Sequence, residues 1–225
     1  MLTGREAARM IDISAVRTHN TRKEIEGLVA IAKEYRFINV HVLPAWVHMT
    51  ADLLKNDPDI LVGSPVGFPG GGHTTATKIT EAVQLLNDGV GEMDIVMNVG
   101  RFLSGEGDYV ERELRSIIEI VDHKVPTKVI IEINTMNDEE MLRAADIVIQ
   151  SGADFVKTGT GWVPGGENAN IERIRKLKDF CGDRIKVKAA GGIRTPEQFM
   201  TLADMGVERM GINTKSALEI VKALG

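Results

Sequence analysis

Short runs of β-branched and other apolar residues alternate with longer amphipathic segments along the whole chain. Runs of about four to eight such residues are typical of strands, and apolar positions spaced by three and four are typical of helices. The predicted strands cover residues 10–14, 39–43, 60–66, 92–98, 128–133, 154–158, 185–189 and 208–212. The predicted helices cover residues 22–35, 45–54, 75–87, 109–121, 138–150, 171–180, 196–205 and 215–224. Each predicted strand therefore precedes one predicted helix.

Local signals mark several of the predicted helix boundaries. Asn137 with Glu140 resembles a capping box, in which each residue satisfies a free backbone N–H of the first turn. Thr195 is followed by Pro196, which suits the first helical position because its ring already fixes a helical φ. Gly152 suits a helix end, where a left-handed residue is often needed. These boundaries support the alternation of strands and helices.

Eight repeats of strand and helix predict an α/β protein with a closed (β/α)₈ TIM barrel. An open doubly wound sheet shows the same alternation, but no GxGxxG follows the first predicted strand. No Pro/Ser-rich linker, low-complexity tract or block of like charge interrupts the pattern, so we expect a single domain over residues 1–225. In such a barrel the chemistry lies at the carboxyl ends of the strands, and polar residues there become the candidates.

Composition argues against several classes of protein. Apolar residues make up 43% of the chain, but no run approaches the roughly 18 residues that cross a bilayer, so we expect no membrane partner. The formal charge is −5 and the basic residues are scattered, which argues against a nucleic-acid partner. The first residues do not resemble a secretory signal, and the single Cys181 cannot form an internal disulfide. We therefore expect a cytoplasmic protein.

Two lysines stand near the ends of successive predicted strands. Lys157 lies on the same face of its strand as Phe155, and Lys188 ends the next strand. An ammonium in an apolar barrel is unfavourable unless it is paired or neutral. Burial and a neighbouring positive charge both lower the pKa of a lysine and expose the amine as a nucleophile toward a carbonyl. The pair thus predicts a reactive amine, although each lysine could instead reach solvent or pair with a carboxylate.

Two aspartates lie within predicted strands of the same barrel. Asp94 could transfer protons or balance the charge of the lysines, and a structural ion pair is the alternative. Asp12, in the first predicted strand, is open between orienting a substrate hydroxyl and anchoring the base of the barrel.

Five segments match a known family in order along the chain. They are residues 67–69 (GFP) with Thr74, Thr75 and Lys78, residues 93–100 (MDIVMNVG), residues 128–132 (KVIIE), residues 153–158 (ADFVKT), and residues 187–189 (VKA) with residues 191–195 (GGIRT). In these segments the chain resembles the deoxyribose-phosphate aldolase family, whose members are class I (Schiff-base) aldolases on a TIM barrel. The resemblance runs from Ile11 to about Gly211.

The resemblance implies roles for the three strand residues. Lys157 is implied to be the Schiff-base lysine, Lys188 the neighbour that lowers its pKa, and Asp94 the residue that transfers protons with a water molecule. The implied reaction is the reversible cleavage of 2-deoxy-D-ribose 5-phosphate to acetaldehyde and D-glyceraldehyde 3-phosphate. A protonated imine withdraws electrons from the adjacent carbon, so we expect neither metal nor cofactor. The five histidines form no HxH or HxxxH pair, and we expect structural or surface positions for them.

The phosphate is expected beyond the last two predicted strands, where backbone N–H groups and a helix N-terminus offer donors. The candidate substrate-binding and phosphate-binding residues are Asp12, Thr160, Gly161, Gly191, Gly192, Arg194, Gly211, Asn213 and Thr214. The glycines among them could instead serve only to form tight turns. Residues 70–73 (GGGH) are either a plain connector, which we favour, or a loop that closes over the site.

Several positions depart from the family pattern. They are residues 13–17 (ISAVR, where His-Thr-Leu-Leu-Lys is usual), His41 (usually Cys), Leu43 before the proline, Trp162 (often Phe or Lys), and Asn213-Thr214 (usually a serine pair). The lysines are retained, whereas the positions expected to face the substrate differ. The reaction type is therefore better supported than the substrate.

Two classes of function remain open. The first is a Schiff-base aldolase on deoxyribose 5-phosphate, or on another short aldehyde and phosphosugar. The second is a phosphosugar-binding barrel without lyase activity, or an isomerase with Asp94 or Glu132 as general base. The expected partners are a small phosphosugar and an aldehyde, and a homodimer is expected because soluble barrels commonly form symmetric dimers.

Overall fold

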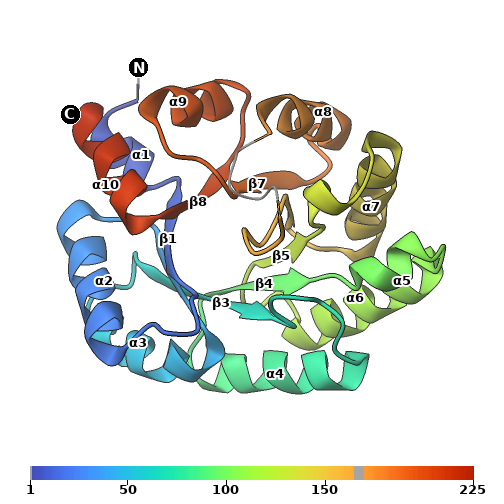
Figure 1. Cartoon of the computed structure of the whole chain (residues 1–225). Coiled ribbons are helices and arrows are strands. Elements are labelled where there is room, and N and C mark those ends of the chain that lie inside the picture. Colours follow the sequence, from blue (N-terminus) through green and yellow to red (C-terminus); the bar gives the residue numbers. More distant parts are fainter. Residues whose placement is uncertain (1, 165–169) are drawn as a thin grey trace.

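A computed structural model of the chain describes residues 2–164 and 170–225. In these residues, eight parallel strands follow one another in chain order around a closed barrel, with helices on the outside (Figure 1). The strands are β1 (Ile11–Ala15), β2 (Asn39–Val42), β3 (Leu61–Val66), β4 (Glu92–Val96), β5 (Thr127–Ile130), β6 (Phe155–Lys157), β7 (Lys186–Ala190) and β8 (Arg209–Asn213). Strand β8 pairs with β1, with Met210 opposite Ile11, and closes the barrel. The predicted (β/α)₈ barrel is confirmed.

Each of the eight predicted helices is present, with ends that differ by a few residues. They are α2 (Arg22–Tyr35), α3 (Val47–Leu54), α4 (Thr75–Asn87), α6 (Gly107–Val121), α7 (Asp138–Ser151), α8 (Ile171–Cys181), α9 (Pro196–Asp204) and α10 (Thr214–Ala223). The predicted capping box of Asn137 and Glu140 begins α7, and Thr195 caps α9 with Pro196 in its first turn. These polar caps satisfy backbone N–H groups that have no partner inside the helix.

Four short elements were not predicted. They are the helices α1 (Gly4–Ala8) and α5 (Val99–Leu103) and the 3₁₀ turns η1 (Pro44–Trp46) and η2 (Ile133–Thr135). Each covers only three to five residues, which is too short for a helical repeat of apolar positions to stand out. Helix α1 begins at a capping box of Thr3 and Glu6, and the Asn98 side chain caps α5.

Two strands end two or three residues earlier than predicted, because their last predicted residues belong to other structure. Strand β4 ends at Val96, since Asn98 turns to cap α5. Strand β5 ends at Ile130, and Glu132 adopts a left-handed backbone with φ of 57°, which a strand does not accommodate. Both ends are at the carboxyl edge of the barrel, where the chain begins the loops that surround the candidate site.

The strands alternate between an apolar outer face and a charged inner face. Ile95, Val129 and Val187 are fully buried. Their polar neighbours Asp94 and Lys188 are buried as well, and ion pairs connect them to charged groups on other strands of the barrel. Burial of each aliphatic side chain contributes roughly 1.5–3 kcal/mol, so the contacts between strands and helices hold the barrel while its interior carries charge.

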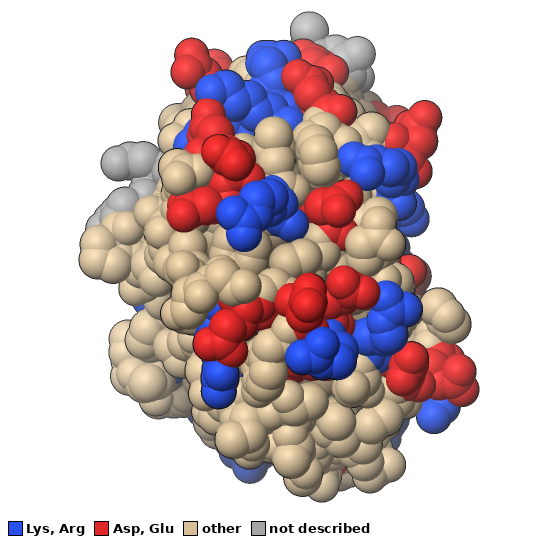
Figure 2. All heavy atoms as spheres, turned by 90° about the vertical axis from the view of Figure 1, so that its right-hand side faces the viewer, with Lys and Arg blue, Asp and Glu red and all other residues tan. Residues whose placement is uncertain are grey.

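The two ends of the chain lie side by side, and α1 packs against α10 next to the junction of β8 and β1 (Figure 1). On the side of the molecule shown in Figure 2, acidic and basic side chains are interspersed. Helix α6 carries one such surface ion pair, between Arg115 and Glu111, and α7 begins with another, between Asp138 and Lys176. None of the helices in the described residues is both long and apolar enough to cross a membrane.

Candidate active site

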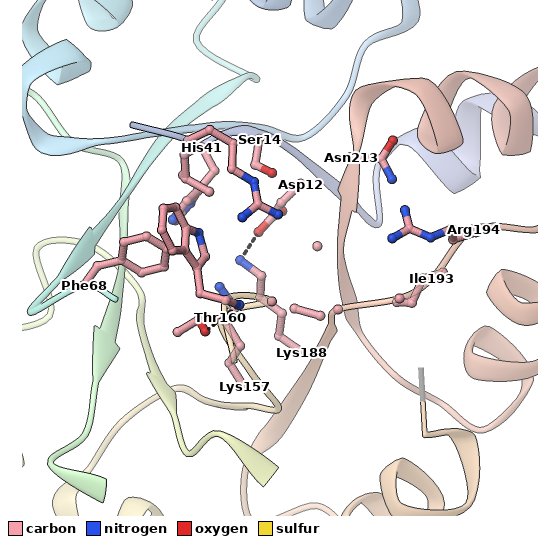
Figure 3. A pocket seen from close by; sticks show the side chains of 18 of the residues that line it. Asp12, Ser14, His41, Phe68, Lys157, Thr160, Lys188, Ile193, Arg194 and Asn213 are labelled. Carbon is pink, nitrogen blue, oxygen red and sulfur yellow. Dashed lines mark hydrogen bonds and ion pairs between the residues drawn. The ribbon is translucent and has the colours of Figure 1, made fainter. Parts of the chain in front are cut away.

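A cavity of about 270 Å³ opens at the carboxyl ends of the strands. Its walls come from the ends of β1, β2, β6, β7 and β8 and from the loops that follow β1, β3, β6 and β7. Figure 3 shows Arg194 and Asn213 on one side of the cavity, His41 and Phe68 on the other, and Lys188 between them. The position agrees with the general rule that chemistry in such barrels occurs at this end.

Lys157 and Lys188 point toward the same carboxylate. Both ammonium nitrogens lie 2.7 Å from Oδ2 of Asp94. The exposed fraction of the side chain is 9% for Lys157, 1% for Lys188 and 0% for Asp94. The expected proximity of the two lysines is present, and so is the alternative expectation that they pair with a carboxylate. Of the three groups, the amine of Lys157 is the one that a molecule in the cavity reaches most easily.

The two lysines differ in electrostatic environment. Burial lowers the pKa of Lys157, and the charge of Lys188 lowers it further, while Asp94 opposes both effects. Burial also acts to lower the pKa of Lys188, but the carboxylates of Asp12 and Asp94 outweigh it, and this pKa is raised. Burial acts to raise the pKa of Asp94, yet the neighbouring lysines hold it well below its usual range. Lys188 therefore stays charged, and Lys157 is the amine that loses its proton more readily.

Asp12 both lines the cavity and anchors the charges below it. Its Oδ2 lies 2.5 Å from the nitrogen of Lys188, and its Oδ1 accepts a hydrogen bond from Arg209. Although burial acts to raise the pKa of Asp12, these two cations lower it below its ordinary value. Asp12 has both the ion pairs of an anchor and a place in the cavity wall, so the choice between its two predicted roles stays open.

The predicted phosphate side has an irregular backbone and an exposed cation. Gly191 and Gly192 line the cavity with φ of 94° and 71°, a left-handed conformation that glycine adopts without strain. Gly211 also lines the cavity, and a β-carbon at this position would lie 3.1 Å from that of Ala190. The exposed side chain of Arg194 lines the same wall.

The start of α10 brings one of its two predicted residues to the cavity. Asn213 lines the wall, and its side chain caps the helix by accepting a hydrogen bond of 3.0 Å from the N–H of Ser216. Thr214, the next residue, does not belong to the wall in the described part of the chain. The predicted contact of Thr214 with a substrate stays a prediction, and the position of Thr214 does not support it.

The loop after β6 is held by Glu132. The carboxylate of Glu132 accepts hydrogen bonds from the backbone N–H and the hydroxyl of Thr160, at 3.1 and 2.5 Å. The same hydroxyl accepts a hydrogen bond from the N–H of Trp162, so the hydroxyl of Thr160 both donates and accepts within this part of the protein. Among the described residues, Thr160 and Gly161 line the cavity, whereas Glu132 lines a small neighbouring pocket that also includes Gly161. Glu132 is thus placed to shape the loop, and its alternative role as the base of an isomerase stays a prediction.

Several cavity residues were not predicted as site residues. The guanidinium of Arg17 lies over the ring of Trp162, 5.0 Å from its centroid, and the ring of Phe68 meets Trp162 edge to face at 5.7 Å. The buried His41 lies with Nε2 3.7 Å from Asp94, and burial lowers its pKa to about 3, so the ring is neutral at pH 7. Arg17, His41 and Trp162 are departures from the family pattern, and this signal pointed to the cavity.

The described residues include no group of three or more His, Cys, Asp or Glu side chains placed to hold a metal ion. Cys181 is buried, and burial raises the pKa of its thiol to about 11. The thiol is therefore protonated at neutral pH and lies outside the chemistry of the cavity.

The chain is similar to aldolases in sequence and in structure, although no protein-family model matches it. The deoxyribose-phosphate aldolase of Rhizobium meliloti is 42% identical over 221 residues, which span 98% of this chain and 88% of the relative. That of Klebsiella pneumoniae is 40% identical over 219 residues, 96% of this chain and 87% of the relative. Among solved structures, an aldolase designated QR15 is 35% identical with a TM-score of 0.90, over 97% of this chain and 95% of the other. The tetrameric deoxyribose phosphate aldolase of Aeropyrum pernix is 26% identical with a TM-score of 0.87, over 98% and 92%.

These likenesses, together with the barrel, make the chain a lyase of the aldolase class. More particularly, the chain belongs to the deoxyribose-phosphate aldolase family, since curated members at about 40% identity match it over nearly its whole length. The resemblance inferred from the five sequence segments is confirmed.

Proposed function

We propose that this protein reversibly cleaves 2-deoxy-D-ribose 5-phosphate to acetaldehyde and D-glyceraldehyde 3-phosphate through an imine on Lys157. One observation carries the proposal. The Lys157 amine faces the cavity and shares a single carboxylate, that of Asp94, with a second lysine. A buried amine with a lowered pKa is the nucleophile that attack on an aldehyde requires.

The proposed reaction begins when the uncharged amine of Lys157 attacks the aldehyde carbon of the substrate. Loss of water gives an imine, which becomes an electron sink when it is protonated. Asp94, acting with a water molecule, accepts the proton of the hydroxyl at carbon 3. The bond between carbons 2 and 3 then breaks, and its electron pair forms the enamine. Glyceraldehyde 3-phosphate leaves, and protonation and hydrolysis of the enamine release acetaldehyde and restore the amine.

The charges around the cavity support a phosphorylated substrate. Within the described residues, the charges of Lys157 and Lys188 are met by Asp94 and Asp12, whereas Arg17 and Arg194 contact no carboxylate. Two arginines without an acidic partner favour an anionic ligand, and guanidinium groups match the geometry of phosphate. We place the phosphate at Gly191, Gly192 and Arg194, with Asn213 at the same wall.

Borohydride trapping tests the proposed amine directly. We expect acetaldehyde with sodium borohydride to inactivate the enzyme and to leave a two-carbon adduct on the peptide that contains Lys157. The Lys157→Ala variant should acquire no adduct there, and deoxyribose 5-phosphate should be cleaved far better than unphosphorylated deoxyribose. Binding of the phosphosugar without any adduct would refute the aldolase mechanism and favour a binding protein that retains only the scaffold.

A related substrate is the second candidate, and the mouth of the cavity favours it. Arg17, His41 and Trp162 replace residues that are usual in the family, and all three line the cavity. They leave the amine unchanged but alter the surface that an aldehyde meets. A panel of short acceptor aldehydes with and without phosphate would separate the two: turnover of another aldehyde above that of glyceraldehyde 3-phosphate would favour the related substrate.

Assembly, domain extent and location stay predictions. We propose a homo-oligomer, with a dimer as the smallest form, while the relative from Aeropyrum pernix is tetrameric. We also propose a single cytoplasmic domain over residues 1–225. Light scattering after size-exclusion chromatography would measure the mass, and a monomer at micromolar concentration would contradict the proposed assembly.

A further inference from the structure

The charged side chains inside the barrel form a closed ring in which positive and negative groups alternate. In order around the ring these are Arg209, Asp12, Lys188, Asp94, Lys128 and Glu92, and Glu92 contacts Arg209 again. The N–O distances are 2.5 Å from Lys188 to Asp12, 2.7 Å from Lys188 to Asp94, 3.6 Å from Lys128 to Asp94, 2.6 Å from Lys128 to Glu92 and 2.8 Å from Arg209 to Glu92. Five strands contribute to this ring, so only the closed barrel assembles it.

The positive and negative charges of the ring are equal in number, and Lys157 is an additional amine outside this balance. Three cations and three carboxylates make up the ring. The ammonium of Lys157 contacts Asp94, which already has Lys188 on the same oxygen and Lys128 near the other. A charged Lys157 would therefore give the barrel interior a net positive charge, and a neutral Lys157 would give it none.

The remaining strands add no charge to this count. Strand β2 contributes His41, which is neutral at pH 7 because burial lowers its pKa to about 3. Strand β3 (LVGSPV) carries no ionisable side chain. Strand β6 contributes Lys157 itself and the ring of Phe155, which lies 5.4 Å from the nitrogen of Lys128.

Three members of the ring lie away from the cavity. Glu92 and Arg209 are the first residues of β4 and β8, at the opposite end of the barrel, and Lys128 is fully buried. In the described part of the chain, neither these three residues nor Asp94 belongs to the cavity wall, but Asp94 contacts Lys157 directly. Any effect of Glu92, Arg209 and Lys128 on the reaction must therefore pass through other side chains.

We propose that the ring makes Lys157 the one amine of the barrel interior that is free to lose its proton, and that Lys128 and Glu92 are positioning residues that act on the reaction through this amine. The inference rests on the proposed amine chemistry. It extends that chemistry to the far end of the barrel, because the balance of charge in the six-membered ring decides whether Lys157 is charged. A buried net charge is unfavourable, so removal of one ring member shifts the proton of Lys157.

The two positioning residues should act with opposite sign. Lys128→Met removes a cation, so a charged Lys157 then restores the balance and its pKa rises. Glu92→Gln keeps the shape and removes an anion, so a charged Lys157 becomes less favourable and its pKa falls. The double variant removes one charge of each sign and leaves a balanced interior. General loss of structure would move both single variants in the same direction.

The test measures the rate of borohydride trapping by acetaldehyde from pH 5 to pH 10, with mass mapping of the adduct on Lys157. Relative to the wild type, we expect the midpoint to rise by about one pH unit in Lys128→Met, to fall in Glu92→Gln, and to return close to the wild-type value in the double variant. One pH unit corresponds to about a tenfold change in the fraction of neutral amine below the midpoint. Lys128→Arg keeps the charge and should keep the midpoint.

Lys78 and Glu113 provide a matched control. They are also fully buried and form an ion pair of 2.7 Å, but they lie on α4 and α6, outside the ring. We expect Lys78→Met, Glu113→Gln and their double variant to leave the midpoint unchanged. Circular dichroism would verify folding, and Glu92→Gln decides the question if Lys128→Met does not fold.

The outcomes separate this inference from the proposed function. A wild-type enzyme without an adduct on Lys157 at any pH would overturn the proposed function, and this inference with it. A wild-type adduct with midpoints that stay the same in Lys128→Met and Glu92→Gln, or that move in the same direction, would overturn the ring alone. Opposite shifts with recovery in the double variant would support it.

Discussion

Two buried lysines of this protein have opposite surroundings. Lys78, on α4, donates hydrogen bonds to Glu113 at 2.7 Å and to the carbonyl of Val96 at 2.8 Å. Lys157, on β6, donates to Asp94, which Lys188 also contacts. Burial lowers the pKa of both, but Glu113 opposes this effect for Lys78, whereas for Lys157 the charge of Lys188 adds to it and Asp94 opposes both.

The difference suggests why one buried lysine can act as a reactive amine while the other forms a structural ion pair. A carboxylate that contacts one lysine opposes the effect of burial on the pKa of that lysine, and the pair of Lys78 and Glu113 also ties two helices together. A carboxylate shared among several cations leaves one of them with little reason to stay charged. Burial alone therefore does not distinguish the two lysines, since it lowers the pKa of both, whereas the cations around their carboxylates differ.

The largest contrast should come from removal of each lysine. Lys157→Met should abolish turnover and leave the protein folded, because Asp94 keeps Lys188. Lys78→Met should keep turnover per folded molecule but lower the free energy of unfolding by about 3–5 kcal/mol, because the buried carboxylate of Glu113 loses its cation and keeps a hydrogen bond of 3.4 Å from Thr75. Chemical denaturation and steady-state kinetics measure both. Comparable losses of stability in the two variants would contradict the distinction between a reactive Lys157 and a structural Lys78.

Asp94→Asn should separate amine chemistry from proton transfer. Without the negative charge of Asp94, the pKa of Lys157 falls further, so imine formation with acetaldehyde should persist. Turnover should nevertheless fall about 10²–10⁴-fold, because the group proposed to accept the hydroxyl proton is gone. Trapping and kcat are measured on the same preparation. If kcat and substrate affinity fell equally, Asp94 would be a structural residue only.

Lys188→Leu should change the pH dependence of the reaction. The charge of Lys188 lowers the pKa of Lys157, so its removal raises that pKa, and the neutral amine appears only at higher pH. We expect the rising limb of the pH–rate profile to move up by about one pH unit or more, with the fold retained because Asp12 keeps Arg209. An unchanged pH–rate profile would show that Lys188 does not lower the pKa of Lys157.

Arg17 should show the smallest effect, because it is an exposed cation at the mouth of the cavity. Arg17→Leu should raise KM for deoxyribose 5-phosphate by no more than about tenfold and leave kcat nearly unchanged, as expected for one exposed charge. Arg112→Leu, an exposed arginine on α6, is the control and should change neither constant. A large fall in kcat would mean that Arg17 acts on the reaction itself.

The sequence predicts much of the fold and the two lysines of the site. Regular alternation predicts the barrel, and a lysine at the end of an apolar strand is conspicuous because it breaks the pattern, as Lys157 and Lys188 do. Short elements such as α1 and α5 are missed, because a few residues carry no periodicity. Their caps depend on single polar side chains that resemble those of ordinary loops.

The charge ring lies beyond sequence reasoning for a different reason. Glu92 and Arg209 are far apart along the chain, and their contact depends on side chains that meet across the barrel interior. Glu92 does precede Asp94 by two residues and shares its face of β4, which was a usable signal. The ion-pair partners of Glu92 could not be predicted from the sequence, because strand order predicts which strands are neighbours but not which side chains meet across the barrel interior.

Competitive acetylation of the wild-type enzyme across pH measures which of the two lysines loses its proton first. Lys157 and Lys188 lie on the same carboxylate oxygen, so their titration order depends on charge and burial around each nitrogen. Mass spectrometry of the two peptides should show Lys157 becoming reactive at a pH below 10.5, the ordinary lysine pKa, and Lys188 only above it. Equal midpoints, or Lys188 reacting first, would contradict the account.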